Sequence, residues 1–231
     1  MKKESNKENN TEMKTGNTAV GRKNGLRRAG RYICAALAAL MLTGLSACSG
    51  GLVSLEYRDG RFVNDREGLS YVPASLAYGP TVQGEAYAYY KNGNITLYTV
   101  GDSDARLWLT EEYGGGATTV FHAASITLPT LREFGAEKII VCQSDTVTAG
   151  ICEITDGDLI EKTISLYTEG EACEWPLTDS VRRYELKFCS PAWPQIYMNL
   201  IYGEFPDGKY LYERESGRCV EIGDLLAEYI D

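Results

Sequence analysis

A cysteine in a processing motif is the residue of this chain with the most specific chemistry. Cys48 closes the run Leu45-Ser46-Ala47-Cys48, which follows an apolar stretch from Ile33 to Leu42 and, before it, a cluster of arginines. A basic region, an apolar region and small residues before a cut are the parts of an export signal. Because a cysteine thiolate is a nucleophile, Cys48 at this place can accept a lipid on its sulfur.

Residues 27–47 resemble a bacterial lipoprotein signal peptide. Arg27, Arg28 and Arg31 match its basic region, and Leu45-Ser46-Ala47 before Cys48 matches its processing box. The resemblance implies that Cys48 becomes the mature N-terminus and carries a diacylglyceryl group. Because two acyl chains give a stable anchor, we expect the lipid on Cys48 to hold the protein on the extracytoplasmic side of a membrane.

Two other interpretations of this segment are weaker. A spanning helix needs ~20 apolar residues, and the run that ends at Leu42 has about ten. A twin-arginine signal needs an apolar pair where Ala29-Gly30-Arg31 stand. We therefore expect a disordered basic leader at 1–26, the signal peptide at 27–47, the lipidated cysteine and a short tether at 48–51, and a single β-rich extracytoplasmic domain at 52–231.

The charge of the expected mature part is strongly negative. Residues 1–47 hold 9 of the 23 Lys+Arg and 3 of the 32 Asp+Glu, so residues 48–231 carry 14 basic and 29 acidic groups, a net charge of −15. Nucleic acid phosphates would be repelled by this balance, as would anionic lipid headgroups. The sequence therefore predicts no nucleic acid partner.

The lone histidine and the glycine run lack the partners that catalysis or phosphate binding needs. His122 has Ser125 nearby, but no GxSxG elbow is present, so we interpret it as structural. Gly114-Gly115-Gly116 lacks the lysine and the helix of a phosphate loop. The sequence thus predicts no catalytic residue and no cofactor.

Two aspartate pairs have the character of oxygen ligands, Asp102/Asp104 and Asp156/Asp158. Neither continues into a calcium loop with a distal glutamate, so we interpret both as turns and expect no metal site. Carboxylate pairs for glycoside hydrolysis are assembled in space rather than in sequence. A hydrolase therefore stays open as an alternative.

Tyrosine is the enriched side chain of the expected domain, since fifteen of the sixteen follow Cys48. Tyr87 and Tyr89 alternate along one expected strand, and Tyr98 lies on its hairpin partner. Tyrosine combines a rigid apolar ring with a polar tip and is enriched at interfaces, but aromatic residues also favour strands in general. Tyr87, Tyr89 and Tyr98 are therefore the candidate binding residues.

Strands joined by tight turns dominate from residue 84 onward. Glu85–Tyr90 and Ile95–Val100 flank Asn92-Gly93, a strong hairpin signal. This hairpin sets Tyr90 opposite Ile95, Ala88 opposite Leu97 and Tyr87 opposite Tyr98. A second hairpin is expected at Asp156-Gly157, with Ile154 opposite Leu159.

A further hairpin is expected between Lys138–Gln143 and Ile151–Thr155, with a register that sets Cys142 opposite Cys152. Export permits disulfides, so we name Cys142 and Cys152 as the candidate pair among the five cysteines after Cys48. The last strands and helices are expected at Tyr184–Cys189, Ile196–Glu204, Tyr210–Glu215, Arg218–Ile222, Pro129–Phe134 and Asp224–Ile230. The predicted fold is mainly β, with antiparallel hairpin-rich sheets in a sandwich or open barrel and one or two short helices.

The expected function is a non-catalytic binding module for a protein or glycan, held to the membrane by the lipid on Cys48. One alternative is a cell-envelope hydrolase that uses paired carboxylates. Another is a structural component of an envelope complex, which predicts a large apolar patch instead of a cleft.

Overall fold

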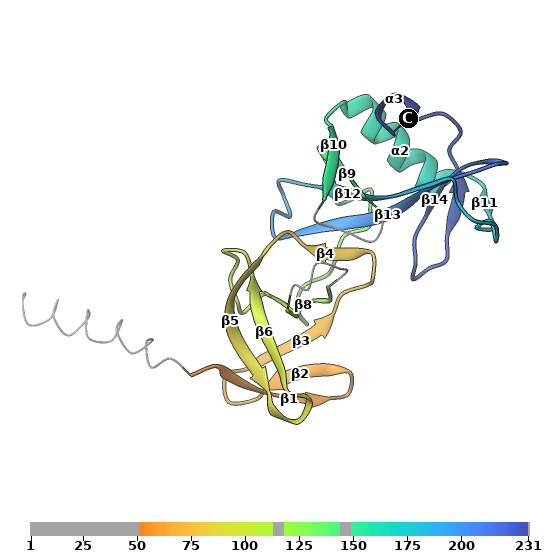
Figure 1. Cartoon of the computed structure of the whole chain (residues 1–231). Coiled ribbons are helices and arrows are strands. Elements are labelled where there is room, and N and C mark those ends of the chain that lie inside the picture. The colour runs from red at the N-terminus through yellow and green to blue at the C-terminus, as the bar shows by residue number, and fades with distance from the viewer. Residues whose placement is uncertain (1–50, 113–117, 144–148, 231) are drawn as a thin grey trace, which may run out of the picture. The chain divides into compact units, whose positions relative to one another are not determined.

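Seven strands between Val53 and Ala123 close into a barrel in the computed structural model, which describes residues 51–112, 118–143 and 149–230 (Figure 1). The strands are β1 (Val53–Arg58), β2 (Arg61–Asn64), β3 (Leu69–Pro73), β5 (Gln83–Tyr90), β6 (Ile95–Val100), β7 (Trp108–Thr110) and β8 (Val120–Ala123). Their order around the barrel is β1-β2-β3-β8-β7-β6-β5. A parallel pairing of β1 with β5, in which Leu55 lies opposite Tyr90, closes the ring.

Side chains that alternate along these strands fill the barrel, as a small barrel requires. The buried set is Leu55, Phe62, Leu69, Tyr71, Ala88, Leu97, Leu109 and Phe121. Phe62 packs edge-on against Phe121, with ring centroids 5.2 Å apart. The Tyr71 hydroxyl donates to the carbonyl of Ala105 at 2.9 Å, which satisfies a polar group inside an apolar core.

The hairpin β5–β6 confirms the predicted pairs Tyr90–Ile95 and Ala88–Leu97. The connection is a 3-10 turn, η1 (Lys91–Gly93), followed by Asn94 in the left-handed region. The predicted pair Tyr87–Tyr98 is wrong, because a bulge at Tyr87 sets Ala86 opposite Tyr98. An extra residue in one strand leaves that residue unpaired and redirects its side chain.

The remaining strands form an eight-stranded sheet within the described residues. They are β4 (Tyr78–Pro80), β9 (Lys138–Gln143), β10 (Gly150–Ile154), β11 (Ala172–Cys173), β12 (Arg182–Cys189), β13 (Ile196–Phe205), β14 (Gly208–Tyr212) and β15 (Cys219–Glu221). The order is β10-β9-β12-β13-β14-β15-β11, and β4 pairs with the start of β13. The predicted strand regions around β9, β10 and β12 to β15 are confirmed.

The predicted hairpin at Asp156-Gly157 is wrong, because helix α2 (Gly157–Glu169) begins there. The Asp156 carboxylate accepts the backbone N–H groups of Asp158 and Leu159 at 3.0 and 3.1 Å, which caps the helix. Ile160, Ile164 and Tyr167 then recur at helical spacing and are buried. The short C-terminal helix α3 (Ala227–Ile230) lies within its predicted range. The helix predicted at Pro129–Phe134 is wrong, because this segment forms only a turn, in which the Phe134 N–H donates to the Thr130 carbonyl at 2.9 Å.

One core joins the barrel to the sheet and the helices. It contains Trp108 and Val120 from the barrel together with residues of β9, β12, β13, α2 and α3. Helix α2 contacts β9 and β15 on this face of the sheet (Figure 1). The mainly β prediction with few helices is confirmed.

Candidate functional site

The three candidate tyrosines differ in their surroundings. Tyr87, at the bulge, is half-buried against the barrel core and its hydroxyl interacts with that of Tyr71. Burial raises the pKa of Tyr87. Tyr89 instead donates to the side-chain oxygen of Asn94 at 2.8 Å, and Tyr98 is half-buried. A role of these tyrosines in binding stays a prediction.

A groove of about 340 Å³ lies where three segments far apart in sequence meet. The first segment follows β4, the second is the turn between β6 and β7, and the third precedes β13. Val82 and Leu107 are exposed at the groove, 55% and 40% respectively, whereas Trp108 is buried. The volume falls in the range of small-ligand sites, roughly 300–1,000 Å³.

Backbone hydrogen bonds hold the groove walls together. The backbone N–H and the hydroxyl of Thr81 both donate to the Gln195 carbonyl, at 3.1 and 3.3 Å. The Gly101 N–H donates to the Val82 carbonyl at 2.7 Å. Gly101 has a φ of +53°, and a Cβ there would lie 3.0 Å from a methyl of Val82, so only glycine fits this wall without strain.

Polar and acidic side chains are among the groove residues. Ser103 Oγ and Gln195 Oε1 are buried atoms with no hydrogen-bond partner among the described residues. Asp102 and Asp104 are exposed, and one Asp104 oxygen accepts the Arg106 N–H at 2.8 Å. The exposed carboxylates are therefore the acceptors that a ligand in the groove can reach.

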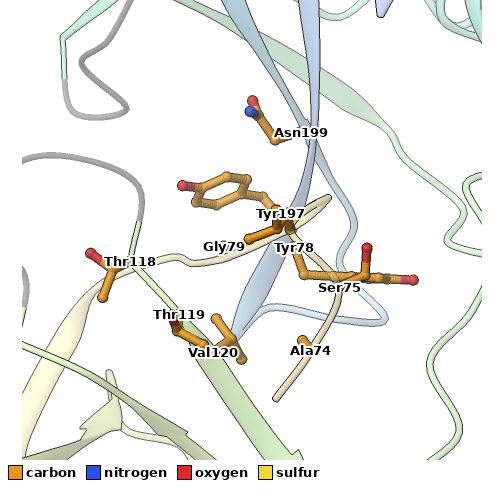
Figure 2. Close-up of a pocket in the computed structure, with 10 residues that line it drawn as sticks. Ala74, Ser75, Tyr78, Gly79, Thr118, Thr119, Val120, Tyr197 and Asn199 are labelled. Atoms are coloured by element: carbon orange, nitrogen blue, oxygen red, sulfur yellow. The ribbon is translucent and has the colours of Figure 1, made fainter. Parts of the chain in front are cut away.

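A second pocket, of about 60 Å³, lies between β8 and the start of β13 (Figure 2). Thr119, Tyr197 and Asn199 line it. A Cβ at Gly79 would overlap the Tyr197 ring, so glycine at this position lets the ring lie against β4. The volume suits a few water molecules and not a ligand of ordinary size.

A buried charge lies behind the second pocket. Glu185 is 1% exposed and binds Arg214 at 2.6 Å, while Asn199 donates to its other oxygen at 2.5 Å. A buried carboxylate needs such partners to stay charged. This cluster therefore has a structural explanation that needs no ligand.

The lone histidine, for which the sequence predicts a structural role, lies buried in the barrel. His122 is 8% exposed, lies opposite Trp108 and Val72 in the barrel, and its Nδ1 contacts the Ala123 carbonyl at 3.0 Å. Burial lowers the pKa of the imidazole. In the described part of the chain, no group of three or more His, Cys, Asp or Glu side chains is arranged to hold a metal ion.

The predicted register for the Cys142–Cys152 pair is wrong. Cys142 lies opposite Gly150, and Cys152 lies opposite Val141, because a bulge shifts the register between β9 and β10. None of the five cysteines of the described residues is in a disulfide. The Cys152 thiol donates to the Tyr229 carbonyl at 3.3 Å and points away from the hairpin partner.

Cys48 and Gly114-Gly115-Gly116 lie outside the described residues. Across the described ranges, no helix has both the length and the apolar character needed to cross a bilayer. No protein-family model, no curated protein and no solved structure matches this chain.

Proposed function

We propose that this chain is a lipid-anchored extracytoplasmic binding module that takes a basic segment of a partner protein into the groove between residues 81–82, 100–108 and 194–195. The observation that carries the proposal is a groove of about 340 Å³ that is lined by the exposed carboxylates Asp102 and Asp104 and by the polar residues Ser103 and Gln195. A lysine or arginine side chain supplies the positive charge and the hydrogen-bond donors that the two carboxylates accept.

Charge and apolar surface support the same choice of ligand. Asp102 and Asp104 are exposed at the groove, and the net charge of −15 for residues 48–231 attracts cations over longer distances. Val82 and Leu107 offer exposed apolar surface, against which the methylene stem of lysine or arginine packs.

The hydrolase alternative is less well supported by these residues. A general acid needs an environment that disfavours the ionised carboxylate, typically a buried apolar one. Asp102 and Asp104 are both exposed, and the Asp104 carboxylate already accepts a backbone N–H from Arg106.

The test is a titration of the protein with a peptide of alternating lysine and leucine, followed by isothermal calorimetry. In the double variant Asp102→Asn/Asp104→Asn we expect the Kd to rise roughly 2- to 30-fold, because two exposed ion pairs are lost. Asparagine keeps the side-chain oxygen that the turn uses. High salt should also weaken the binding of the peptide to the wild-type protein, because it screens the charges.

The matched control is Asp179→Asn, which removes one exposed carboxylate that does not line the groove. Its Kd should equal that of wild type. Equal affinity of the double variant and wild type would contradict the proposed site. If the protein binds a neutral chito-oligosaccharide and does not bind the basic peptide, the ligand of the groove is a glycan and the proposed basic segment is wrong.

A further inference from the structure

Two cysteines face each other at the edge of the eight-stranded sheet. Strand β11 pairs with β15 so that Cys173 lies opposite Cys219, and the Cys173 thiol donates to Cys219 Sγ at 3.4 Å. Directly opposed residues of antiparallel strands have Cα atoms about 4.5–5.5 Å apart. That spacing falls inside the ~4.4–6.8 Å range of disulfides.

The two thiols differ in their access to solvent. Cys173 is exposed, whereas Cys219 is 0% exposed and packs with Phe205 and Tyr210. An external reagent therefore reaches Cys173 first, and Cys219 is placed to attack the sulfur of Cys173 from inside. This arrangement of one accessible and one resolving thiol is what thiol–disulfide exchange requires.

The other three cysteines of the described residues are directed elsewhere. Cys142, Cys152 and Cys189 each point a thiol at a backbone carbonyl, at 3.9, 3.3 and 3.8 Å. The Cys142–Cys152 hairpin does not oppose its two cysteines. The geometry therefore favours the pair formed by Cys173 and Cys219.

We propose that Cys173 and Cys219 are a disulfide-forming site that is oxidised by exchange with an external disulfide. The Cys173 thiolate attacks the external disulfide, forms a mixed disulfide and releases one thiol. Cys219 then attacks Cys173 Sγ and releases the second thiol. The two thiol hydrogens of this chain end on the two sulfurs of the external disulfide, which is reduced while the cysteines are oxidised.

The second step is expected to be the slow one. Burial and the neighbouring Cys173 raise the pKa of Cys219 to about 12, so little of it is thiolate at neutral pH. Because the thiolate is the attacking form, the mixed disulfide at Cys173 should accumulate briefly and should clear faster as the pH rises.

The bond would fix the edge of the sheet. Strand β11 has two residues and follows α2 directly. Trp175, two positions after Cys173, packs against Tyr212 with tilted rings and meets Phe205 edge-on, with ring centroids 4.8 and 5.0 Å apart. A link from Cys173 to Cys219 would hold this aromatic cluster together when β11 frays, as short edge strands do.

The experiment treats the purified full chain with oxidised glutathione, blocks free thiols and digests with trypsin without reduction. Cleavage after Lys162, Arg182 and Arg218 places Cys173 in the peptide 163–182 and Cys219 in the peptide 219–231. Mass spectrometry should find these two peptides joined, with the loss of two hydrogens. Oxidation should also raise the Tm by roughly 5–15 °C.

Because Cys173 is exposed, its replacement by serine is expected to leave the fold intact whether or not the proposal is correct. Cys173→Ser should lose both the linked peptides and the Tm shift, while Cys152→Ser should keep both. The proposal is overturned if glutathione stays attached to Cys173 after prolonged incubation at high pH. It is also overturned if the recovered link joins Cys142 to Cys152 or joins two chains.

Discussion

At the level of single residues, Ser103 allows a role in ligand binding to be distinguished from a role in folding stability. Ser103 Oγ is buried without a hydrogen-bond partner among the described residues. An unsatisfied buried polar atom costs about 1–3 kcal/mol of folding free energy. If a ligand in the groove reaches this oxygen, the cost is removed only in the complex, so removal of the hydroxyl would stabilise the fold and weaken binding.

Ser103→Ala is expected to raise the free energy of unfolding by up to about 1 kcal/mol, because the uncompensated hydroxyl disappears. The same variant should weaken binding of the basic peptide by a few-fold. Chemical denaturation and calorimetry measure the two effects.

Ser70→Ala is the matched control, because Ser70 Oγ is also buried without a partner but lies on β3 and does not line the groove. It should stabilise the fold to a similar extent and leave the Kd unchanged. A loss of affinity in both variants would place the effect outside the groove.

The contribution of histidine to the pH dependence of folding stability comes from one residue, because His122 is the only histidine of the chain. Its folded-state pKa lies below 6.5 because of burial, so the unfolded chain binds the proton more readily. The stability that depends on neutral His122 is present above about pH 6.5 and is lost as the pH falls through the folded pKa. An NMR titration of the imidazole should show a midpoint below 6.5, and a midpoint above it contradicts this.

At the level of elements, short-range signals predict the strands well and misassign one dipeptide. The pairs Tyr90–Ile95 and Ala88–Leu97 follow from the turn at Asn92-Gly93 and from alternating apolar residues. Asp156-Gly157 is also a turn signal, but aspartate is equally an N-cap. The helical recurrence of Ile160, Ile164 and Tyr167 is the signal that could have decided in favour of the helix.

Bulges explain the other register errors. Tyr87 and the stretch from Gly150 to Cys152 each add a residue to one strand. A one-residue shift changes which side chains face each other, and nothing in a single sequence marks where it occurs. The predicted pairs Tyr87–Tyr98 and Cys142–Cys152 are wrong for this reason.

The cap on α2 gives a prediction for one element. Asp156→Ala should lower the free energy of unfolding by about 1 kcal/mol, because Asp158 N–H and Leu159 N–H lose their acceptor. Asp156→Asn should retain most of the stability, since asparagine caps helices nearly as well. Urea denaturation of the two variants measures the difference, and equal losses would mean that the carboxylate charge, not the cap, stabilises the helix.

At the level of the whole molecule, long-range pairings determine both the barrel and the groove. The barrel closes through the parallel pair β1–β5, and the groove joins segments that are nearly a hundred residues apart, from Val100 to Gln195. Turn signals connect only strands that are neighbours in the sequence, so the sequence predicts the sheets but neither the closure of the barrel nor the groove. Asp102 and Asp104 stand out in the sequence as a pair of possible oxygen ligands. Ser103 and Gln195, which line the same groove, carry no such local signal.

The proposed anchor determines where the groove would act. Only Ser49-Gly50-Gly51 separate Cys48 from Leu52, and three residues span at most ~10 Å. A module with a net charge of −15 held this close to anionic headgroups is repelled by them. It would present its acidic groove to basic partners rather than to the lipid surface.

Replacement of Cys48 by alanine tests the anchor in the full chain, expressed in a bacterium that is fed a labelled fatty acid. Wild type should take up the label and sediment with membranes, and Cys48→Ala should do neither, because the sulfur that carries the lipid is gone. Cys34→Ala is the matched control, since it removes the other cysteine of the first 51 residues from within the apolar run. If Cys48→Ala keeps the label and Cys34→Ala loses it, the lipid is attached to Cys34 and not to Cys48. The proposal that the groove is held close to the membrane by Cys48 would then be wrong.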